Sequence, residues 1–216
     1  FNGIIKNATI SKTNTNKYYV SLCVDVENYI LPKNDFKVGI DLGIKEFCVM
    51  SDGVVINNPK ILYHYQDKLT KLQRQLAHKT IGSNRYNKQK LKIAKLHEKI
   101  ANIRKDFLHK LSSEIINENQ VIITEDLNVK GMVKNHKLAK SISDVSWSEF
   151  TRQLEYKSEW YGRTYHKVNR YYASSQLCNV CGYKNKDLTL KDRNWCCPKC
   201  STEHDRDVNA SININK

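Results

Sequence analysis

The sequence has no run of 18 or more apolar residues, no internal repeat and no low-complexity segment. The lack of a long apolar run excludes a membrane-spanning helix of ordinary length. The N-terminus also lacks the basic and then apolar pattern of a secretion signal. We therefore expect no membrane partner. Because the chain begins with Phe1 and not with Met, we also expect a fragment or a processed product.

Acidic residues are few beside basic ones. The 216 residues include 36 Lys and Arg against 22 Asp and Glu, which gives a formal net charge of +14 and a pI near 9.4. Such an excess favours a polyanionic partner, of which nucleic acid is the commonest. A basic protein whose positive face is merely solvated is the alternative. The length suits one domain of ordinary size plus a small insertion.

The seven cysteines do not fit a disulfide framework. Four form the pairs Cys178-x-x-Cys181 and Cys197-x-x-Cys200, and the other three are an odd number, which favours a reducing, cytoplasmic compartment. Two such pairs can fold four thiolates round one tetrahedral Zn²⁺ ion, whose closed shell gives it a structural role. Cys197 is preferred to Cys196 because it gives both pairs the same spacing. Four buried cysteines without a metal are the alternative.

The spacing of apolar residues predicts an α/β layout with a mixed sheet. A capping-box spacing at 146–149 marks the start of one helix, and Ser83 or Asn84 caps another. Cys23 is expected to be a small buried residue. The basic segment 128–143 reads either as a lid over a substrate or as a solvated loop. The predicted strands lie at 4–10, 18–26, 36–50, 54–56, 121–127 and 164–172, and the predicted helices lie within 59–117, at 146–161 and after residue 205.

The long helical segment holds most of the excess charge. Between Lys60 and Glu118 lie fourteen Lys and Arg and five acidic residues, so this segment accounts for +9 of the +14. Apolar stripes at helical spacing predict two helices here, separated by a break at 82–84. Their solvent sides would form a basic wall for a phosphate backbone.

Three acidic residues occupy positions that suggest a site. Asp41 lies in mid-strand between apolar neighbours, where a carboxylate is costly to desolvate, although a solvent-facing strand acid is the alternative. Glu125 ends a β-branched run, at a point where sheets expose functional groups. Asp207 follows the second cysteine pair at a helix start, and Asp205 is expected to cap that helix.

If Asp41, Glu125 and Asp207 converge, they can hold two Mg²⁺ ions about 3.5–4 Å apart. One ion would activate water and the other would stabilise the leaving oxygen, as in-line phosphodiester hydrolysis requires. Arg206 would either reach a phosphate or stay solvated. The residues therefore raise the hypothesis of a divalent-metal-dependent nuclease.

Three stretches carry a resemblance to a known family. They read GIDLGIKEFCVMSDG, ITEDLNVKGMVKN and SSQLCNVCG…CPKCSTEHDRDVNASINI, and they resemble the motifs of the TnpB family in order and spacing. TnpB proteins are RNA-guided DNA nucleases encoded by insertion sequences and related to type V CRISPR effectors. The resemblance covers nearly the whole chain.

The resemblance implies an RNase H-like (RuvC) nuclease interrupted by a Cys₄ zinc ribbon that binds target nucleic acid. It places the catalytic, magnesium-binding acids on Asp41, Glu125 and Asp207, the last through the pattern Asp-x-Asn-Ala. It places structural zinc on the four paired cysteines. The implied partners are a DNA target and a guide RNA from the transposon end, in a bacterial or archaeal cytosol.

The resemblance also implies a division of the chain. Residues 1–30 would be the end of an N-terminal wedge β domain, 36–174 the RuvC core with the first two acids, 175–203 the zinc ribbon and 204–216 the last RuvC helix with the third acid. Family members carry a further N-terminal half that helps to hold guide RNA, and we expect this half to be missing here.

Two other functions fit the same residues. A non-cleaving remnant would grip DNA or RNA and act as an accessory or regulator of transposition. A junction-resolving nuclease of the same fold would prefer branched DNA, and the expected zinc ribbon argues against this function.

Overall fold

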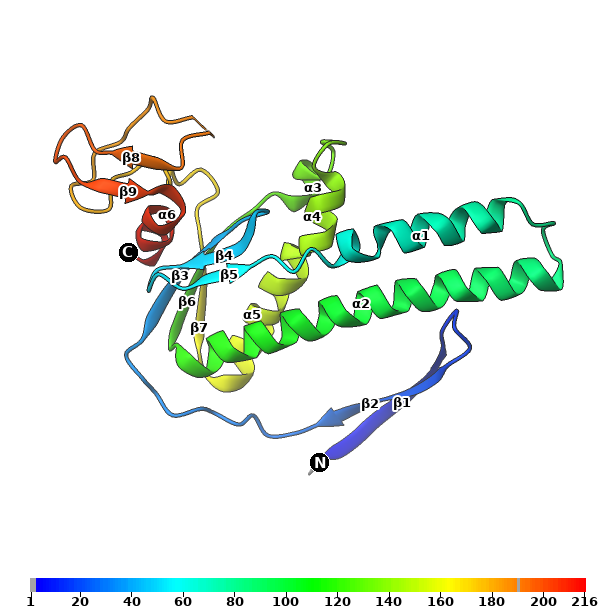
Figure 1. Ribbon diagram of the computed structural model, residues 1–216. Helices are drawn as coiled ribbons and strands as arrows, with labels where there is room; N and C mark the ends of the chain where they lie inside the picture. Colours follow the sequence, from blue (N-terminus) through cyan, green and yellow to red (C-terminus); the bar gives the residue numbers. More distant parts are fainter. Residues whose placement is uncertain (1–2, 190) are drawn as a thin grey trace. The chain divides into compact units, whose positions relative to one another are not determined.

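The computed structural model describes residues 3–189 and 191–216 (Figure 1). Phe1 and Asn2 of the expected wedge segment and Leu190 of the expected ribbon lie outside the described residues. The chain divides into two compact units. The first comprises Phe1–Tyr29 and Lys60–Phe107, and the second comprises Ile30–Pro59 and Leu108–Lys216.

The first unit contains a β-hairpin, one helix and most of a longer helix. Its elements are β1 (Ile4–Lys12), β2 (Tyr18–Asp25), α1 (Ile61–Ala77) and the larger part of α2 (Asn84–Glu118). The second unit contains the end of α2 and the remaining elements. These are β3 (Lys37–Leu42), β4 (Glu46–Met50), β5 (Val55–Asn57), β6 (Val121–Glu125), α3 (Val129–Met132), α4 (Ala139–Val145), α5 (Trp147–Tyr161), β7 (Thr164–Val168), β8 (Asn194–Cys196), β9 (Glu203–Asp205) and α6 (Arg206–Asn215).

β1 and β2 form a two-stranded antiparallel sheet in which Lys12 pairs with Tyr18 beside the turn. Nearly all residues of both strands are exposed. Cys23 is exposed as well, so the prediction that it is buried is wrong. Burial requires a second layer against a strand, and the alternation of apolar residues does not reveal whether such a layer is present.

α1 and α2 pack on one another through the predicted apolar stripes. The amide of Tyr86 donates a hydrogen bond of 3.1 Å to Oγ of Ser83, so Ser83 is the cap of α2. The side-chain amide of Gln89 donates to the carbonyl of Leu72 at 3.0 Å and ties the two helices together. The buried cluster between the helices consists of Ile61, Leu69, Leu96 and Ile100.

The second unit is built on a five-stranded mixed sheet with the order β5-β4-β3-β6-β7. β3, β4 and β5 are antiparallel neighbours, whereas β6 pairs in parallel with β3 and β7 pairs in parallel with β6. Ile40 of β3 lies opposite Thr124 of β6. Because parallel strands end at the same edge of a sheet, the next residues of these strands, Asp41 and Glu125, reach neighbouring positions.

α6 packs against β3 at Gly39, in mid-strand. A Cβ atom on Gly39 would lie 2.3 Å from the carbonyl oxygen of Ser211 and 2.5 Å from the amide nitrogen of Asn215. Only glycine permits this approach of two backbones. Because side chains alternate along a strand, Gly39 and Asp41 share the face of the sheet that α6 covers.

α5 and the end of α2 supply another part of the core of the second unit. Phe150 and Leu154 of α5 are fully buried, and the ring of Phe150 lies edge-on to that of Phe47 in β4, with 5.0 Å between centroids. The hydroxyl of Ser112 in α2 donates to Oε1 of Gln153 at 3.0 Å. In the part of the chain that the structure describes, no helix has the length and apolar character needed to cross a membrane.

The capping box predicted at 146–149 is not formed, although α5 does begin there. Ser146 follows α4 directly and also ends that helix, with a left-handed φ of 57°. Its hydroxyl donates to the carbonyl of Ser143, and Glu149 binds Arg152 instead. One residue shared between two helices therefore cannot adopt the extended backbone that a capping box requires.

Other boundaries also differ from the prediction. The strand region 36–50 divides into the antiparallel strands β3 and β4, and β6 ends two residues before the predicted end at 127. The last strand of the sheet ends at Val168, four residues before the predicted end, because Oδ1 of Asn169 accepts a hydrogen bond from the amide of Tyr171 and turns the chain. The segment 128–143 is not a plain loop, since it contains α3 and the start of α4.

Candidate metal centres

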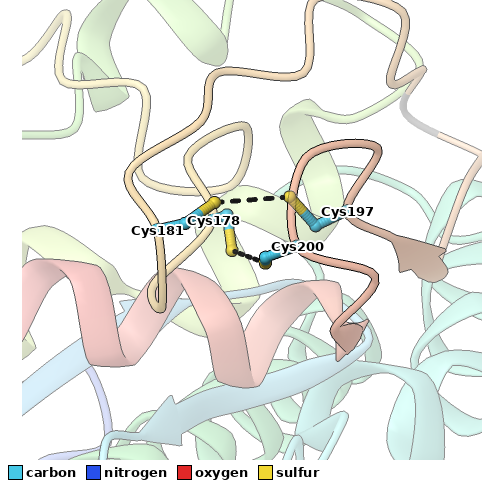
Figure 2. A group of neighbouring side chains, drawn as sticks. All are labelled: Cys178, Cys181, Cys197 and Cys200. Atoms are coloured by element: carbon cyan, nitrogen blue, oxygen red, sulfur yellow. Dashed lines mark hydrogen bonds between the residues drawn. The ribbon is translucent and has the colours of Figure 1, made fainter.

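Four cysteine thiols from two loops face one another in the second unit (Figure 2). Sγ of Cys178 lies 3.6 Å from Sγ of Cys200, and Sγ of Cys181 lies 3.5 Å from Sγ of Cys197. All four sulfur atoms lie within 4.8 Å of one another. Cys196 is exposed and outside the group. The cysteines that the spacing selects are thus the ones that the structure brings together.

This cluster fits a tetrahedral metal ion. Zn–S bonds of about 2.3 Å place the sulfur atoms of a tetrahedral site about 3.8 Å apart, close to the two distances above. Hydrogen bonds from the hydroxyl and the amide of Thr202 lower the pKa of the Cys200 thiol to about 6 and favour the thiolate that a metal needs. Four sulfur ligands would leave no open position, so Zn²⁺ here would be structural.

His204 adds a contact that the sequence analysis did not anticipate. Its Nε2 lies 3.1 Å from Sγ of Cys178, and its ring lies against that of Trp195 with 4.6 Å between centroids. Burial lowers the pKa of His204, which favours the neutral ring. With its proton on Nε2, the ring would donate to a metal-bound thiolate, as outer partners of metal ligands commonly do.

The three predicted acids lie on three elements of the second unit. Asp41 lies near the end of β3, Glu125 is the last residue of β6, and Asp207 lies in the first turn of α6. All three are partly buried. They are therefore neither fully solvated surface acids nor core residues.

The electrostatics of Asp41 show that these acids are close enough to interact. Burial raises the pKa of Asp41 well above its usual range, and the carboxylates of Glu125 and Asp207 raise it further. The guanidinium groups of Arg206 and Arg193 act in the opposite direction. Like charges gathered in a partly desolvated place favour protonation or the binding of cations.

The three carboxylates are spread more widely than the cysteines. Within residues 3–189 and 191–216, the four cysteines are the one group of three or more possible ligands whose atoms all lie within 4.8 Å of one another. A single ion bound by all three acids would require closer packing. Divalent cations, which prefer oxygen ligands, would take them from these carboxylates singly or in pairs.

Glu125 is oriented by a residue outside the predicted set. The buried hydroxyl of Ser174 donates a hydrogen bond of 2.8 Å to Oε1 of Glu125. Burial raises the pKa of Glu125, and this hydrogen bond opposes the rise. Ser174 thus favours the ionised form of a carboxylate that burial alone would tend to protonate.

Asp205 and Asp207 have different roles at the start of α6. Oδ1 of Asp205 accepts hydrogen bonds of 3.0 Å from the amides of Asp207 and Val208, which confirms Asp205 as the predicted cap. The carboxylate of Asp207 instead pairs with Nη1 of Arg193, at 3.1 Å from Oδ2 and 3.3 Å from Oδ1. Arg206 is partly buried and its Nη1 donates to the carbonyl of Thr189 at 2.6 Å, so it is more than a solvated side chain, while a contact with phosphate stays a prediction.

Two buried asparagines connect α6 to the start of the cysteine-rich segment. The side-chain amides of Asn209 and Asn213 both donate to the carbonyl of Leu177, at 2.7 and 2.6 Å. Asn213 also donates to the carbonyl of Ser174 at 2.9 Å. Oδ1 of Asn209 accepts from the amide of Asn179 at 3.0 Å. The segment that supplies Cys178 is therefore fixed to the helix that carries Asp207.

The sequence pattern did not single out these supporting residues, and the signals for them were unequal. Ser174 and Asn209 lie inside the stretches that carry the family resemblance, so their placement in the motif could have marked them. Arg193 lies between the cysteine pairs with no spacing to single it out. Its role depends on the pairing of Asn194 with Asp205 in β8 and β9, which brings the neighbouring Arg193 to α6.

Comparisons with known protein families agree with this architecture. The profile of OrfB from IS605-type elements, described as "Probable transposase", matches residues 21–136, more than half of the chain. The chain belongs to the TnpB (OrfB) family. A second profile, described as "Cas12f1-like, TNB domain", matches residues 147–214, which include the cysteine cluster of this TnpB chain.

Two relatives match almost all of the chain. It is 41% identical over 206 residues to a protein of Streptomyces pristinaespiralis named "Putative RNA-guided DNA endonuclease". This match covers 95% of this chain and 51% of the relative. It is also 35% identical over 229 residues to "Putative RNA-guided DNA endonuclease InsQ" of Escherichia coli K12. This second match covers 98% of this chain and 56% of the relative. The chain thus spans about half the length of these curated relatives.

A solved structure shares the fold. The protein described as "Cryo-EM structure of the Cas12f1-sgRNA-target DNA complex" aligns with 96% of this chain and 55% of its own, with a TM-score of 0.60 and 20% sequence identity. At this identity the likeness concerns the fold alone. It confirms the predicted RNase H-like (RuvC) α/β class with a helical hairpin and a Cys₄ insertion.

Proposed function

We propose that this TnpB chain is the nuclease portion of an RNA-guided, divalent-metal-dependent DNA endonuclease of transposon origin. The observation that carries the proposal is the shared electrostatic environment of Asp41, Glu125 and Asp207, which come from distant parts of the sequence. Holding like charges together in a partly buried place costs stability, and bound cations offset that cost. The names of the two relatives support the same activity.

In the proposed mechanism Asp41, Glu125 and Asp207 would hold two Mg²⁺ ions, which when bound would supply activation of water and stabilisation of the leaving oxygen of a phosphodiester. The hydrogen bond from Ser174 orients Glu125 and favours its ionised form. Asp205 satisfies the first amides of α6, so the carboxylate of Asp207 is not needed as a helix cap. Partial burial of the site keeps bulk water away and strengthens each charge interaction.

The helical hairpin supports a nucleic acid partner. Basic residues recur at helical spacing along α2 and are exposed, so they form one basic stripe. Such a stripe fits the phosphate backbone of the DNA target or of a guide RNA from the transposon end. The residues of this α2 stripe are Arg85, Lys88, Lys92, Lys95 and Lys99.

Cleavage assays with matched variants test the proposal. D41N, E125Q and D207N each remove one proposed metal ligand, whereas D126N and D205N change the adjacent acids. The ion pair of Asp126 with Arg170 is exposed and its loss should cost little, and Asn is as good a helix cap as Asp, so we expect both controls to fold. The assays use Mg²⁺ and guide-matched DNA, with guide RNA and the N-terminal half of a full-length relative supplied.

We expect cleavage by D41N, E125Q and D207N to fall below detection and cleavage by D126N and D205N to stay within about tenfold of wild type. Equal cleavage by wild type and D41N would exclude the proposed site. Salt-sensitive DNA binding by wild type without any cleavage, even with the added components, would indicate a non-cleaving chain instead.

A further inference from the structure

We propose that a small cavity beside Glu125 binds one unpaired nucleobase of the DNA strand that is cut. This inference rests on the proposed function and adds to it a site for a base of the substrate. The cavity lies in the second unit and has a volume of about 190 Å³. Its lining runs from Leu42 and Glu125, at the ends of β3 and β6, to Trp147 and Thr151 of α5. One of the three acids thus belongs to its wall.

The size and lining of the cavity suit a single flat ring system. Pockets for drug-sized ligands have about 300–1,000 Å³, so this smaller cavity has no room for a base pair. Ser148 and Thr151 line it and offer hydroxyl groups to the edge of a ring. Apolar side chains line it as well and can cover the faces of the ring. These are Leu42, Leu127, Val129 and Trp147.

Trp147 supplies a buried hydrogen-bond donor that lacks an acceptor. The residue is 2% exposed, and within residues 3–189 and 191–216 its Nε1 has no hydrogen-bond partner. A buried donor without an acceptor costs free energy of folding, and native structures keep few of them. A ring nitrogen or carbonyl oxygen of a base in the cavity would provide the acceptor.

The charges around the cavity favour a base over a phosphate. Five ionisable side chains line it, and all of them except that of Glu125 are in ion pairs. Arg152 pairs with Glu149 at 2.8 Å, Lys167 pairs with Glu155 at 3.4 Å, and Asp126 pairs with Arg170 at 2.6 Å. The charge that stays uncompensated is therefore negative. It repels a phosphate group but not a neutral base.

The position of the cavity assigns the base to the cut strand. A phosphodiester bound at the acids carries its own base a few ångströms away, and Glu125 borders both places. A base within a duplex is paired and stacked, so it can enter the cavity only after it has left the helix. The cavity would therefore select a single-stranded segment. A base held there would also determine which phosphodiester lies at the acids.

Substitutions at two lining residues separate this role from that of the acids. The hydroxyl of Thr151 donates a hydrogen bond of 3.3 Å to the carbonyl of Ser148 within α5. T151F would place a ring in the cavity, and T151V is its matched control, because Val has the shape of Thr and leaves the cavity open. W147F removes the indole N–H and keeps an aromatic ring. Thermal unfolding of each variant checks that it folds.

Binding is measured on the full chain without cleavage, with Ca²⁺ in place of Mg²⁺. The two probes are a thymidine trinucleotide and the same sugar–phosphate backbone without its bases. The readout is the indole N–H signal of Trp147 in ¹⁵N NMR spectra, which W147F identifies among the signals of the three tryptophans. A merely structural role of the cavity would not make this signal respond to the bases of the probe.

We expect the thymidine trinucleotide to shift the Trp147 signal and to bind wild type about 5- to 100-fold more tightly than the base-free backbone does. T151F should lose most of this preference, whereas T151V should keep it. W147F should bind the trinucleotide about 2- to 10-fold more weakly than wild type, because it lacks the donor. In guided cleavage with Mg²⁺, T151F should cut DNA about 10- to 100-fold more slowly than T151V.

Two results would overturn the inference even if D41N abolishes cleavage. One is equal binding of both probes with an unmoved Trp147 signal, which would show that the cavity holds only water. The other is equal binding and equal cleavage by T151F and T151V. In contrast, a base-dependent shift of the Trp147 signal in a chain whose cleavage does not depend on Asp41 would refute the proposed nuclease site and leave the base site in place.

Discussion

The hydroxyl of Ser174 donates a hydrogen bond of 2.8 Å to Oε1 of Glu125, while the carbonyl of the same residue accepts one of 2.9 Å from Asn213. Ser174 thereby joins the end of β6 to α6. Because α6 carries Asp207 and the segment after Ser174 carries Cys178, one buried serine connects both candidate metal centres. Neither its side chain nor its backbone can shift without moving one of them.

Removing this hydroxyl should impair the acidic site more than the fold. We expect S174A to raise the Mg²⁺ concentration for half-maximal cleavage by about 10- to 100-fold, because Glu125 loses the donor that orients it. S175A is the matched control, since Oγ of Ser175 accepts only a longer hydrogen bond of 3.3 Å from Arg206. A Mg²⁺ titration of both variants decides the matter, and equal titrations would refute the positioning role of Ser174.

Loss of zinc should weaken the acidic site as well as the ribbon. The hydrogen bonds from Asn209 and Asn213 to Leu177 transmit disorder of the cysteine-rich segment to α6. We expect C178S, or treatment with a zinc chelator, to lower Tm and to weaken Mn²⁺ binding at the acids. C196S, which changes an exposed cysteine outside the cluster, should do neither. Unchanged Mn²⁺ binding in zinc-depleted protein would contradict this coupling.

Asp41 should make the metal-free protein less stable as pH rises. Burial and then the charges of Glu125 and Asp207 raise the pKa of Asp41 above its ordinary value of 3.8, so the folded chain binds this proton more tightly than the unfolded chain does. Stability is therefore lost as pH rises from that ordinary value through the raised pKa.

D41N removes this dependence. We expect metal-free D41N to melt about 2–4 °C above wild type at neutral pH, the change that about 1 kcal/mol produces in a chain of this length. The difference should vanish at pH values below 3.8, where Asp41 is protonated in both states. Excess Mg²⁺ should raise the Tm of wild type but not that of D41N. Identical pH profiles for the two metal-free proteins would show that folding does not raise the pKa of Asp41.

A methyl group at Gly39 should separate α6 from the sheet. The nearest atoms, at 2.3 and 2.5 Å, belong to the backbone of α6 and cannot rotate away. We expect G39A to lower the free energy of unfolding by about 1–3 kcal/mol and to reduce Mn²⁺ binding. In G53N the new side chain meets open space, and Asn tolerates the positive φ of 88° better than most residues, so the loss of stability should be smaller than in G39A. Denaturant titrations compare the two.

The basic stripe on α2 should determine nucleic acid affinity without sequence preference. We expect the double variant K92A/K95A to bind guide RNA and DNA more weakly, with a salt slope reduced by about 1 for each phosphate group that is no longer neutralised. K6A removes a lysine that pairs with Asp25 in the β-hairpin and serves as the control. Binding curves at several salt concentrations distinguish them, and parallel slopes for all three proteins would refute a role for the stripe.

Periodicity and motif spacing anticipated the architecture well. The apolar stripes located α1 and α2, and the β-branched run located β6, because these signals are local and repeat over several residues. The N-cap roles of Ser83 and Asp205 followed from the same local chemistry. The early end of β7 has a local cause, the turn at Asn169, whereas two other failed expectations have a tertiary or junction cause. Ser146 serves two helices at once, and Cys23 lies on a sheet without a covering layer in the described chain.

The candidate site was anticipated less completely. The cysteine pairs and the three acids could be named because their residue types are informative at their positions. Ser174 and Arg193 could not be assigned roles. A serine before the first cysteine pair and an arginine between the two pairs have many possible partners. Their contacts with Glu125 and Asp207 depend on how β6, β8 and α6 pack, which no local pattern encodes.

The packing of α6 on β3 at Gly39 also fixes when the proposed nuclease can first act. β3 leaves the ribosome before α6, yet the backbone that packs against β3 belongs to Ser211 and Asn215 of α6. During synthesis Asp41 and Glu125 therefore stay partly uncovered until α6 has emerged from the exit tunnel. A nascent chain with only two of the three acids would therefore lack part of the proposed metal site.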